Sequence, residues 1–245
     1  MATEQTTQEM QKTQVFNVII LDRSGSMGCI RRAAVDGFNE TLAGIKKAQE
    51  KFEKTQEHFV TLVAFCCCET EYIFDKVPAA EARPLSLEDY RPCCGTPLYD
   101  AMGFTLTQMQ KHMAALTDAV VVVTIITDGM ENSSREYTGS TIRRLVSELR
   151  EDGWTFTYMG ANQDSVEVAM TLSIRNARNF DYSSEGTMHT MQRDAATRLN
   201  FYSRLDEMKC ADNLGREAAM PARERRRRYT AMADEAFDEV EREGK

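Results

Sequence analysis

The sequence predicts an α/β fold, in which a mostly parallel central sheet carries helices on both faces. Residues 15–21 (VFNVIIL) and 119–126 (AVVVVTII) are apolar runs rich in β-branched residues, as expected of strands buried on both faces. Segments with apolar residues at helical spacing separate such runs. Strands that alternate with amphipathic helices favour parallel pairing, because each helix carries the chain back across the sheet.

The first half of the chain contains one further strand pair. Apolar residues at helical spacing between Ile30 and Phe52 predict a helix after the first strand. Residues 58–65 (HFVTLVAF) and 72–77 (YIFDKV) then read as two strands, and the few residues between them permit only a hairpin. This pair should therefore be antiparallel, and the proline-containing segment 78–95 that follows should be a loop.

The second half repeats the alternation of helix and strand. Helical spacing predicts helices over 98–116, 140–151, 164–172 and 188–202. Strands are expected at 119–126 and 154–159, with a short edge strand at 179–182.

Composition divides the chain into three parts. Residues 1–14 are expected to be a flexible leader, and 15–205 to be the α/β domain. Residues 206–245 are highly charged, and apolar residues at helical spacing from Tyr229 to Val240 predict a helical extension that packs on the domain or on a partner. The Arg-rich run 223–228 is interpreted as a solvated helix with internal ion pairs. No aromatic platform accompanies it, so we expect no nucleic-acid binding.

Charge and cysteine usage suggest a cytoplasmic protein. The net charge is −8, no apolar run reaches the roughly 18 residues of a membrane span, and the N-terminal segment lacks an apolar signal core. Cys66, Cys67 and Cys68 are consecutive and Cys93 and Cys94 are adjacent, a spacing that suits reduced thiols rather than disulfides. The chain has no C-x-x-C pair, so a zinc site is not expected, and Cys66 and Cys68 are interpreted as small core residues.

Oxygen-bearing side chains follow the two most apolar strands. Residues 22–26 (DRSGS) come directly after the first strand, 127–129 (TDG) follow the strand 119–126, and 95–97 (GTP) precede a helix. Ligand sites of open α/β sheets lie at the carboxyl ends of the strands. Carboxylates and hydroxyls are hard ligands that suit Mg²⁺ or Mn²⁺, with Ca²⁺ also possible. The candidate metal ligands are Asp22, Ser24, Ser26, Thr96 and Asp128.

This set resembles the metal-ion-dependent adhesion site of von Willebrand factor A-type (vWA) domains, as in integrin inserted domains. The strings LDRSGSM, GTPLYDA and ITDGMEN, and YMGANQDS at 158–165, are similar to small intracellular bacterial-type vWA proteins. The resemblance covers about residues 15–205. It implies a Rossmann-like vWA fold with six strands in the order 3-2-1-4-5-6 and hydroxyl ligation by Ser24, Ser26 and Thr96. It also implies that Asp22 and Asp128 bind the metal directly or through water.

The same resemblance implies a non-enzymatic function. An open position on the metal would take an aspartate or glutamate from a protein partner. The chain would act as an interaction module, for example as an adaptor for an ATPase or a multiprotein complex. One alternative is a vWA scaffold with a purely structural metal. Another is a phosphatase of the haloacid dehalogenase type with Asp22 as nucleophile, but that chemistry needs an acidic proton carrier two positions later, where this chain has Ser24.

Three polar residues close in sequence to the candidate ligands are Asp100, Glu131 and Asn132. They are interpreted as solvated loop or helix residues, with a role in partner choice as the alternative.

Overall fold

A computed structural model describes residues 12–161, 165–180, 184–213 and 220–243. Its centre is a six-stranded sheet in the order β3-β2-β1-β4-β5-β6. Neighbouring strands pair in parallel except β2 and β3, which form an antiparallel hairpin. The predicted fold class, strand order and hairpin are therefore confirmed. The strands are β1 (Thr13–Asp22), β2 (Gln56–Cys66), β3 (Glu69–Pro78), β4 (Ala119–Thr127), β5 (Thr155–Gly160) and β6 (Asn176–Asn179).

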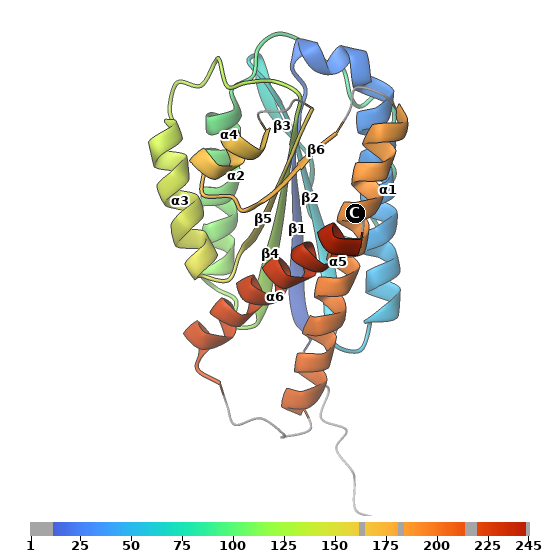
Figure 1. Cartoon of the computed structure of the whole chain (residues 1–245), viewed down its shortest axis with the longest axis vertical. Coiled ribbons are helices and arrows are strands. Elements are labelled where there is room, and N and C mark those ends of the chain that lie inside the picture. Colours follow the sequence, from blue (N-terminus) through green and yellow to red (C-terminus); the bar gives the residue numbers. More distant parts are fainter. Residues whose placement is uncertain (1–11, 162–164, 181–183, 214–219, 244–245) are drawn as a thin grey trace, which may run out of the picture.

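Helices cover both faces of this sheet (Figure 1). One face packs against α1 and α5, and the other against α2, α3 and α4. The central strands β1 and β4 are buried almost throughout, as their apolar runs predict. The helices are α1 (Arg31–Lys51), α2 (Leu98–Met113), α3 (Gly139–Glu151), α4 (Ser165–Thr171), α5 (Ser184–Asn213) and α6 (Ala222–Glu243), with a 3-10 turn η1 (Gly25–Ile30) before α1. No helix in the described part of the chain is long and apolar enough to cross a membrane.

The edge strand β6 lies earlier than its predicted position. It spans Asn176–Asn179, where 179–182 was expected, and residues 181 and 182 lie outside the described part of the chain. The strand has a polar sequence because one of its buried residues is Arg178, which donates hydrogen bonds to Thr197 and Glu241. An apolar pattern could not have revealed a strand whose inward face carries a paired arginine.

The boundaries drawn from composition do not coincide with the ends of elements. β1 begins at Thr13, within the predicted leader, and residues 1–11 lie outside the described part of the chain. α5 continues through residue 206 to Asn213. Its buried side chains run on from Phe201 to Met208 because they pack against α6.

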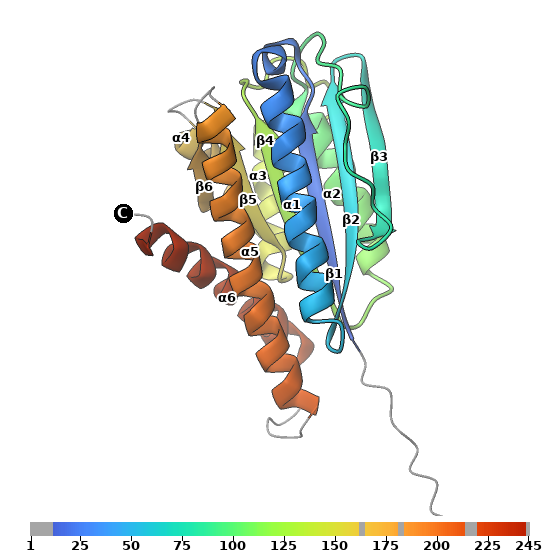
Figure 2. The same cartoon turned by 90° about the vertical axis from the view of Figure 1, so that its right-hand side faces the viewer.

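Helix α6 packs on the domain, and Figures 1 and 2 show it crossing α5. Tyr229, Ala233 and Ala236 are buried in this contact. The ion pairs described for α6 join it to other elements, for example Arg226 to Asp152 at 3.5 Å. The run 223–228 is largely exposed, as expected of a solvated helix, but its described ion pairs reach other elements instead of lying within the helix, because an apolar stripe docks α6 on the domain.

A buried polar layer fixes α5 to the sheet. Arg198 is 5% exposed and binds the Asp194 carboxylate at 2.6 Å. It also donates to Thr124 on β4 and to Asn17, in the middle of β1, which in turn accepts from the Tyr202 hydroxyl. Sequence reasoning missed this layer, although an asparagine within the apolar run 15–21 was its visible signal.

Candidate metal centre

The three polar segments meet at one end of the sheet, the upper end in Figure 1. Leu21 of β1 is paired with Ile126 of β4, so the loops that follow these two strands leave the sheet side by side. The segment 95–97 reaches the same place because α2 begins there. All five predicted ligands are thus brought together by strand register and by the path of one loop.

Asp22 is held rigidly at the base of the site. Its side chain is fully buried, and its two carboxylate oxygens accept from different donors. Oδ1 accepts from the Ser24 amide at 2.7 Å, and Oδ2 accepts from the Thr127 hydroxyl at 2.6 Å. The Tyr90 hydroxyl also donates to the backbone carbonyl of Asp22. Thr127, which sequence reasoning did not single out, therefore orients this carboxylate.

A chain of short contacts links the remaining polar groups. The hydroxyls of Ser24 and Ser26 lie 3.1 Å apart, and Ser26 donates to Asp128 Oδ1 at 2.7 Å. The other oxygen of Asp128, Oδ2, is buried and has no hydrogen-bond partner among the described residues. A buried carboxylate oxygen without a partner is costly, so this atom is suited to bind a cation.

The surroundings of Gly129 show that Thr96 belongs to the site. A Cβ atom built on Gly129 would lie 3.1 Å from Thr96 Oγ1, 3.6 Å from Ser26 Oγ and 3.8 Å from Asp22 Oδ2. Three of the predicted ligand oxygens therefore surround the space beside this glycine. Any larger residue would place a methyl group within the ring of oxygens, so the absence of a side chain keeps the cradle open.

Burial shifts the acid–base behaviour of both carboxylates in the same direction. Burial raises the pKa of Asp22 to about 6, against the opposing hydrogen bonds from Thr127 and Ser24, and the nearby Asp128 adds to the rise. Burial also raises the pKa of Asp128. Both shifts express mainly the cost of burying a carboxylate charge away from water. A bound cation would remove that cost.

The three polar neighbours shape the loops and are not simply solvated. The side-chain oxygen of Asn132 accepts a hydrogen bond from the Thr96 backbone amide at 2.9 Å, and the backbone amide of Asn132 donates to the Thr96 carbonyl at 3.1 Å. Glu131 accepts from the amides of Tyr99, Ser133 and Ser134. Asp100 accepts from three consecutive amides, at 135–137. Asn132 is exposed and the two acidic residues are half-buried, but all three also hold loop amides, which the interpretation as solvated residues did not include. The amides held by Asp100 and Asn132 lie on distant segments, so no local sequence pattern indicates them.

The donor set fits a hard divalent cation. It consists of two carboxylates and three neutral hydroxyls, with no sulfur or imidazole among them, and Mg²⁺, Mn²⁺ and Ca²⁺ prefer such oxygen ligands. Asp22, Ser24, Ser26, Thr96 and Asp128 could hold it. Ser26 is exposed, so the site opens to solvent on one side.

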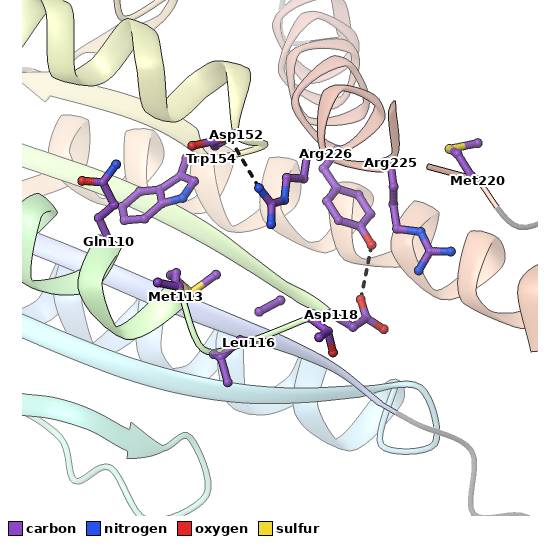
Figure 3. Close-up of a pocket in the computed structure, with 13 residues that line it drawn as sticks. Gln110, Met113, Leu116, Asp118, Asp152, Trp154, Met220, Arg225 and Arg226 are labelled. Atoms are coloured by element: carbon purple, nitrogen blue, oxygen red, sulfur yellow. Dashed lines mark hydrogen bonds and ion pairs between the residues drawn. The ribbon is translucent and has the colours of Figure 1, made fainter. Parts of the chain in front are cut away.

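A pocket of about 390 Å³ lies at the opposite end of the sheet and takes no part in this site. Figure 3 shows it between the N-terminal part of α6 and the end of α2. The Tyr229 hydroxyl there donates to Asp118 at the start of β4, and Arg226 pairs with Asp152. Its walls depend on the docking of α6, so it belongs to the packing of that helix.

Comparison with known proteins places the fold. No family model matches the sequence, and no curated protein matches it. Among solved structures, the pilus adhesin SpaC from Lactobacillus rhamnosus GG is similar to 79% of this chain and to 32% of its own length, with a TM-score of 0.57 and 14% identity. The manganese-loaded TRAP protein of Plasmodium vivax aligns over 72% of both chains with a TM-score of 0.49 and 13% identity. The strand order, the hairpin at the β3 edge and the position of the polar loops show that this chain has a vWA-type fold.

Proposed function

We propose that this protein is a divalent-cation-dependent protein-binding module. The cation would be held by Asp22, Ser24, Ser26, Thr96 and Asp128, and would take an aspartate or glutamate carboxylate of a partner at its open position. The buried Oδ2 of Asp128 carries this proposal, because it has no hydrogen-bond partner among the described residues and a cation would compensate its charge. The bound cation would supply a Lewis-acidic centre for that carboxylate.

The number of donors leaves room for an external ligand. Three of the five donors are neutral hydroxyls, so the two carboxylates only balance a divalent cation and do not saturate its ligand sphere. The exposed side at Ser26 leaves access for a partner. We propose Mg²⁺ as the resident cation, with Mn²⁺ as the closest substitute and Ca²⁺ less suited to a compact site. A cytoplasmic location and an adaptor role beside an ATPase or within a multiprotein complex are extensions of the same proposal.

Binding is proposed in preference to catalysis. The position two residues after Asp22 is Ser24, and its hydroxyl lies 3.1 Å from that of Ser26. A serine hydroxyl cannot supply the proton transfer that a carboxyl group provides in aspartate-dependent phosphatases near neutral pH. Phosphatase activity that disappears in Asp22→Asn would contradict this proposal.

The test separates an interaction site from a structural metal. Chelator-stripped protein is titrated with Mg²⁺, Mn²⁺ and Ca²⁺ while its thermal stability is followed, because a ligand that binds only the folded state raises it. Ser24→Ala combined with Ser26→Ala should abolish cation-dependent partner capture with an unchanged metal-free melting temperature. Ser147→Ala, an exposed serine on α3, is the matched control. Unfolding of the double variant would assign the metal to the scaffold, and no response to any cation at millimolar concentration would refute the site.

A further inference from the structure

Four cysteine thiols gather next to the metal centre without belonging to it. The Sγ atoms of Cys66, Cys68, Cys93 and Cys94 all lie within 4.8 Å of one another. Cys66 is the last residue of β2 and Cys68 lies in the turn that leads to β3, whereas Cys93 and Cys94 lie in the loop before α2. The linear spacing gave no sign of this, because each segment supplies only half of the cluster.

We infer that these four cysteines form a second metal site, a tetrathiolate site for Zn²⁺ that joins the β2–β3 turn to the loop carrying Thr96. Thiolate sulfurs at about 2.3 Å from a tetrahedral zinc lie about 3.8 Å from one another. The sulfurs here are separated by 3.0 Å between Cys66 and Cys93, 3.1 Å between Cys68 and Cys94, and 3.5 Å between Cys93 and Cys94. Small side-chain movements outward would therefore admit the ion.

The backbone around the cluster is arranged to hold the thiols in place. Cys94 has a φ of +43°, a left-handed conformation that is uncommon for a residue with a side chain. In an extended segment consecutive side chains point in opposite directions, so this conformation allows two adjacent cysteines to face one point. The Cys67 amide donates to the Gly95 carbonyl at 3.0 Å, and this bond fastens the turn to the loop.

Charge and access also suit a zinc–thiolate centre. The guanidinium of Arg23, 5% exposed, approaches Cys66 Sγ to 4.0 Å. This guanidinium also pairs with Glu69 and Glu71, which fix it in position, so it would give the Cys66 thiolate a hydrogen-bond donor outside the metal's ligand set. Cys68 and Cys94 are exposed, which gives the ion a path from solvent.

The thiolate site would also position the first metal centre. The Cys93 amide donates to the Arg23 carbonyl, and the Gly25 amide donates to the Cys94 carbonyl, both at 2.9 Å. These bonds flank Ser24, and Thr96 follows two residues after Cys94. A zinc ion on the cysteines would thus hold the Thr96 loop against the loop of Ser24 and Ser26.

Cobalt substitution tests the proposal on the full chain, purified under a phosphine reductant. Co²⁺ on thiolates gives intense sulfur-to-metal charge-transfer absorption, whereas Co²⁺ on oxygen ligands does not, so this result does not depend on the oxygen site. We expect one such cobalt per chain, displaced by Zn²⁺ that binds more tightly than about 100 nM. Zinc should shield four of the seven cysteines from a thiol reagent. Absence of the charge-transfer band, or two disulfides within the cluster that persist in the presence of the reductant, would overturn the proposal.

Matched variants identify the ligands. Cys66→Ser with Cys93→Ser removes one thiol from each segment and should abolish the cobalt band, whereas Cys29→Ser with Cys210→Ser changes two exposed thiols outside the cluster and should leave it intact. Should the first variant fail to fold, the thiol-protection count of the unmodified chain still decides the question. Removal of zinc should weaken Mg²⁺ binding at least about fivefold, and an unchanged Mg²⁺ affinity would refute the positioning role alone.

Discussion

Replacing Asp22 by asparagine should make the metal-free protein more stable. The site can accept the amide without new strain: Oδ1 keeps the hydrogen bond from the Ser24 amide, and Nδ2 can donate to the Thr127 hydroxyl. The Thr127 hydroxyl then turns its proton to the Gly129 carbonyl, 3.1 Å away. Asp22→Asn therefore removes a buried charge while it preserves the local bonding.

The size of the effect follows from the acid–base behaviour of Asp22. Burial raises its pKa from 3.8 to about 6. In the metal-free protein the Asp22 carboxyl is therefore protonated below about pH 4 and does not reduce the free energy of unfolding. As the pH rises through 6, the carboxyl ionises and the free energy of unfolding falls. Two pKa units correspond to about 3 kcal/mol, which is the upper limit of the gain in free energy of unfolding at pH 7.5. The variant lacks this loss at all pH values.

Urea denaturation in chelator and in Mg²⁺ measures both parts of the prediction. In chelator the variant should unfold at the higher urea concentration. In Mg²⁺ at about 1,000 times the dissociation constant, the unmodified protein should gain about 4.1 kcal/mol and the variant much less, so that the order of stability reverses. Asp36→Asn, at an exposed position of α1, should change neither. A variant that is less stable in chelator, or that gains as much from Mg²⁺, would refute the reasoning.

Three further substitutions test separate parts of the structure. Gly129→Ala places a methyl group 3.1 Å from Thr96 Oγ1 and should weaken Mg²⁺ binding about tenfold in calorimetry, with little change in metal-free stability. Burial lowers the pKa of His58 to about 3, so stability that is present above pH 6.5 is lost as the pH falls. The His58→Leu variant should lose up to about 3 kcal/mol less free energy of unfolding than the unmodified protein between pH 6.5 and 4. Asp194→Ala leaves Arg198 buried without its 2.6 Å partner and should cost about 3–5 kcal/mol in urea denaturation.

Each of these has a contrary outcome. An unchanged Mg²⁺ affinity in Gly129→Ala would place the cation elsewhere. An acid profile in His58→Leu that matches the unmodified protein would show that another group dominates the loss of stability. A cost below about 1 kcal/mol for Asp194→Ala would mean that Arg198 reaches solvent or a second anion once its partner is gone.

Local patterns were sufficient for the elements that build the sheet. The apolar runs 15–21 and 119–126 identified the central strands, because burial on both faces requires an uninterrupted apolar sequence. The candidate ligands could be selected for a related reason. Asp22 and Asp128 each follow such a strand directly, and parallel strands end at the same edge of a sheet.

What only the tertiary structure decided depends on contacts between distant segments. β6 was not recognised at its true position because its inward residue, Arg178, is charged and pairs with a residue of α6. Glu131 and Asn132 act by accepting hydrogen bonds from backbone amides at the start of α2 and in the loop before it. The cysteine cluster arises because one hairpin turn and one loop are fastened together, with Cys94 in a left-handed conformation. A sequence pattern reports how each residue meets solvent along its own element, whereas these features depend on strand register and on the path of loops, which local sequence does not encode.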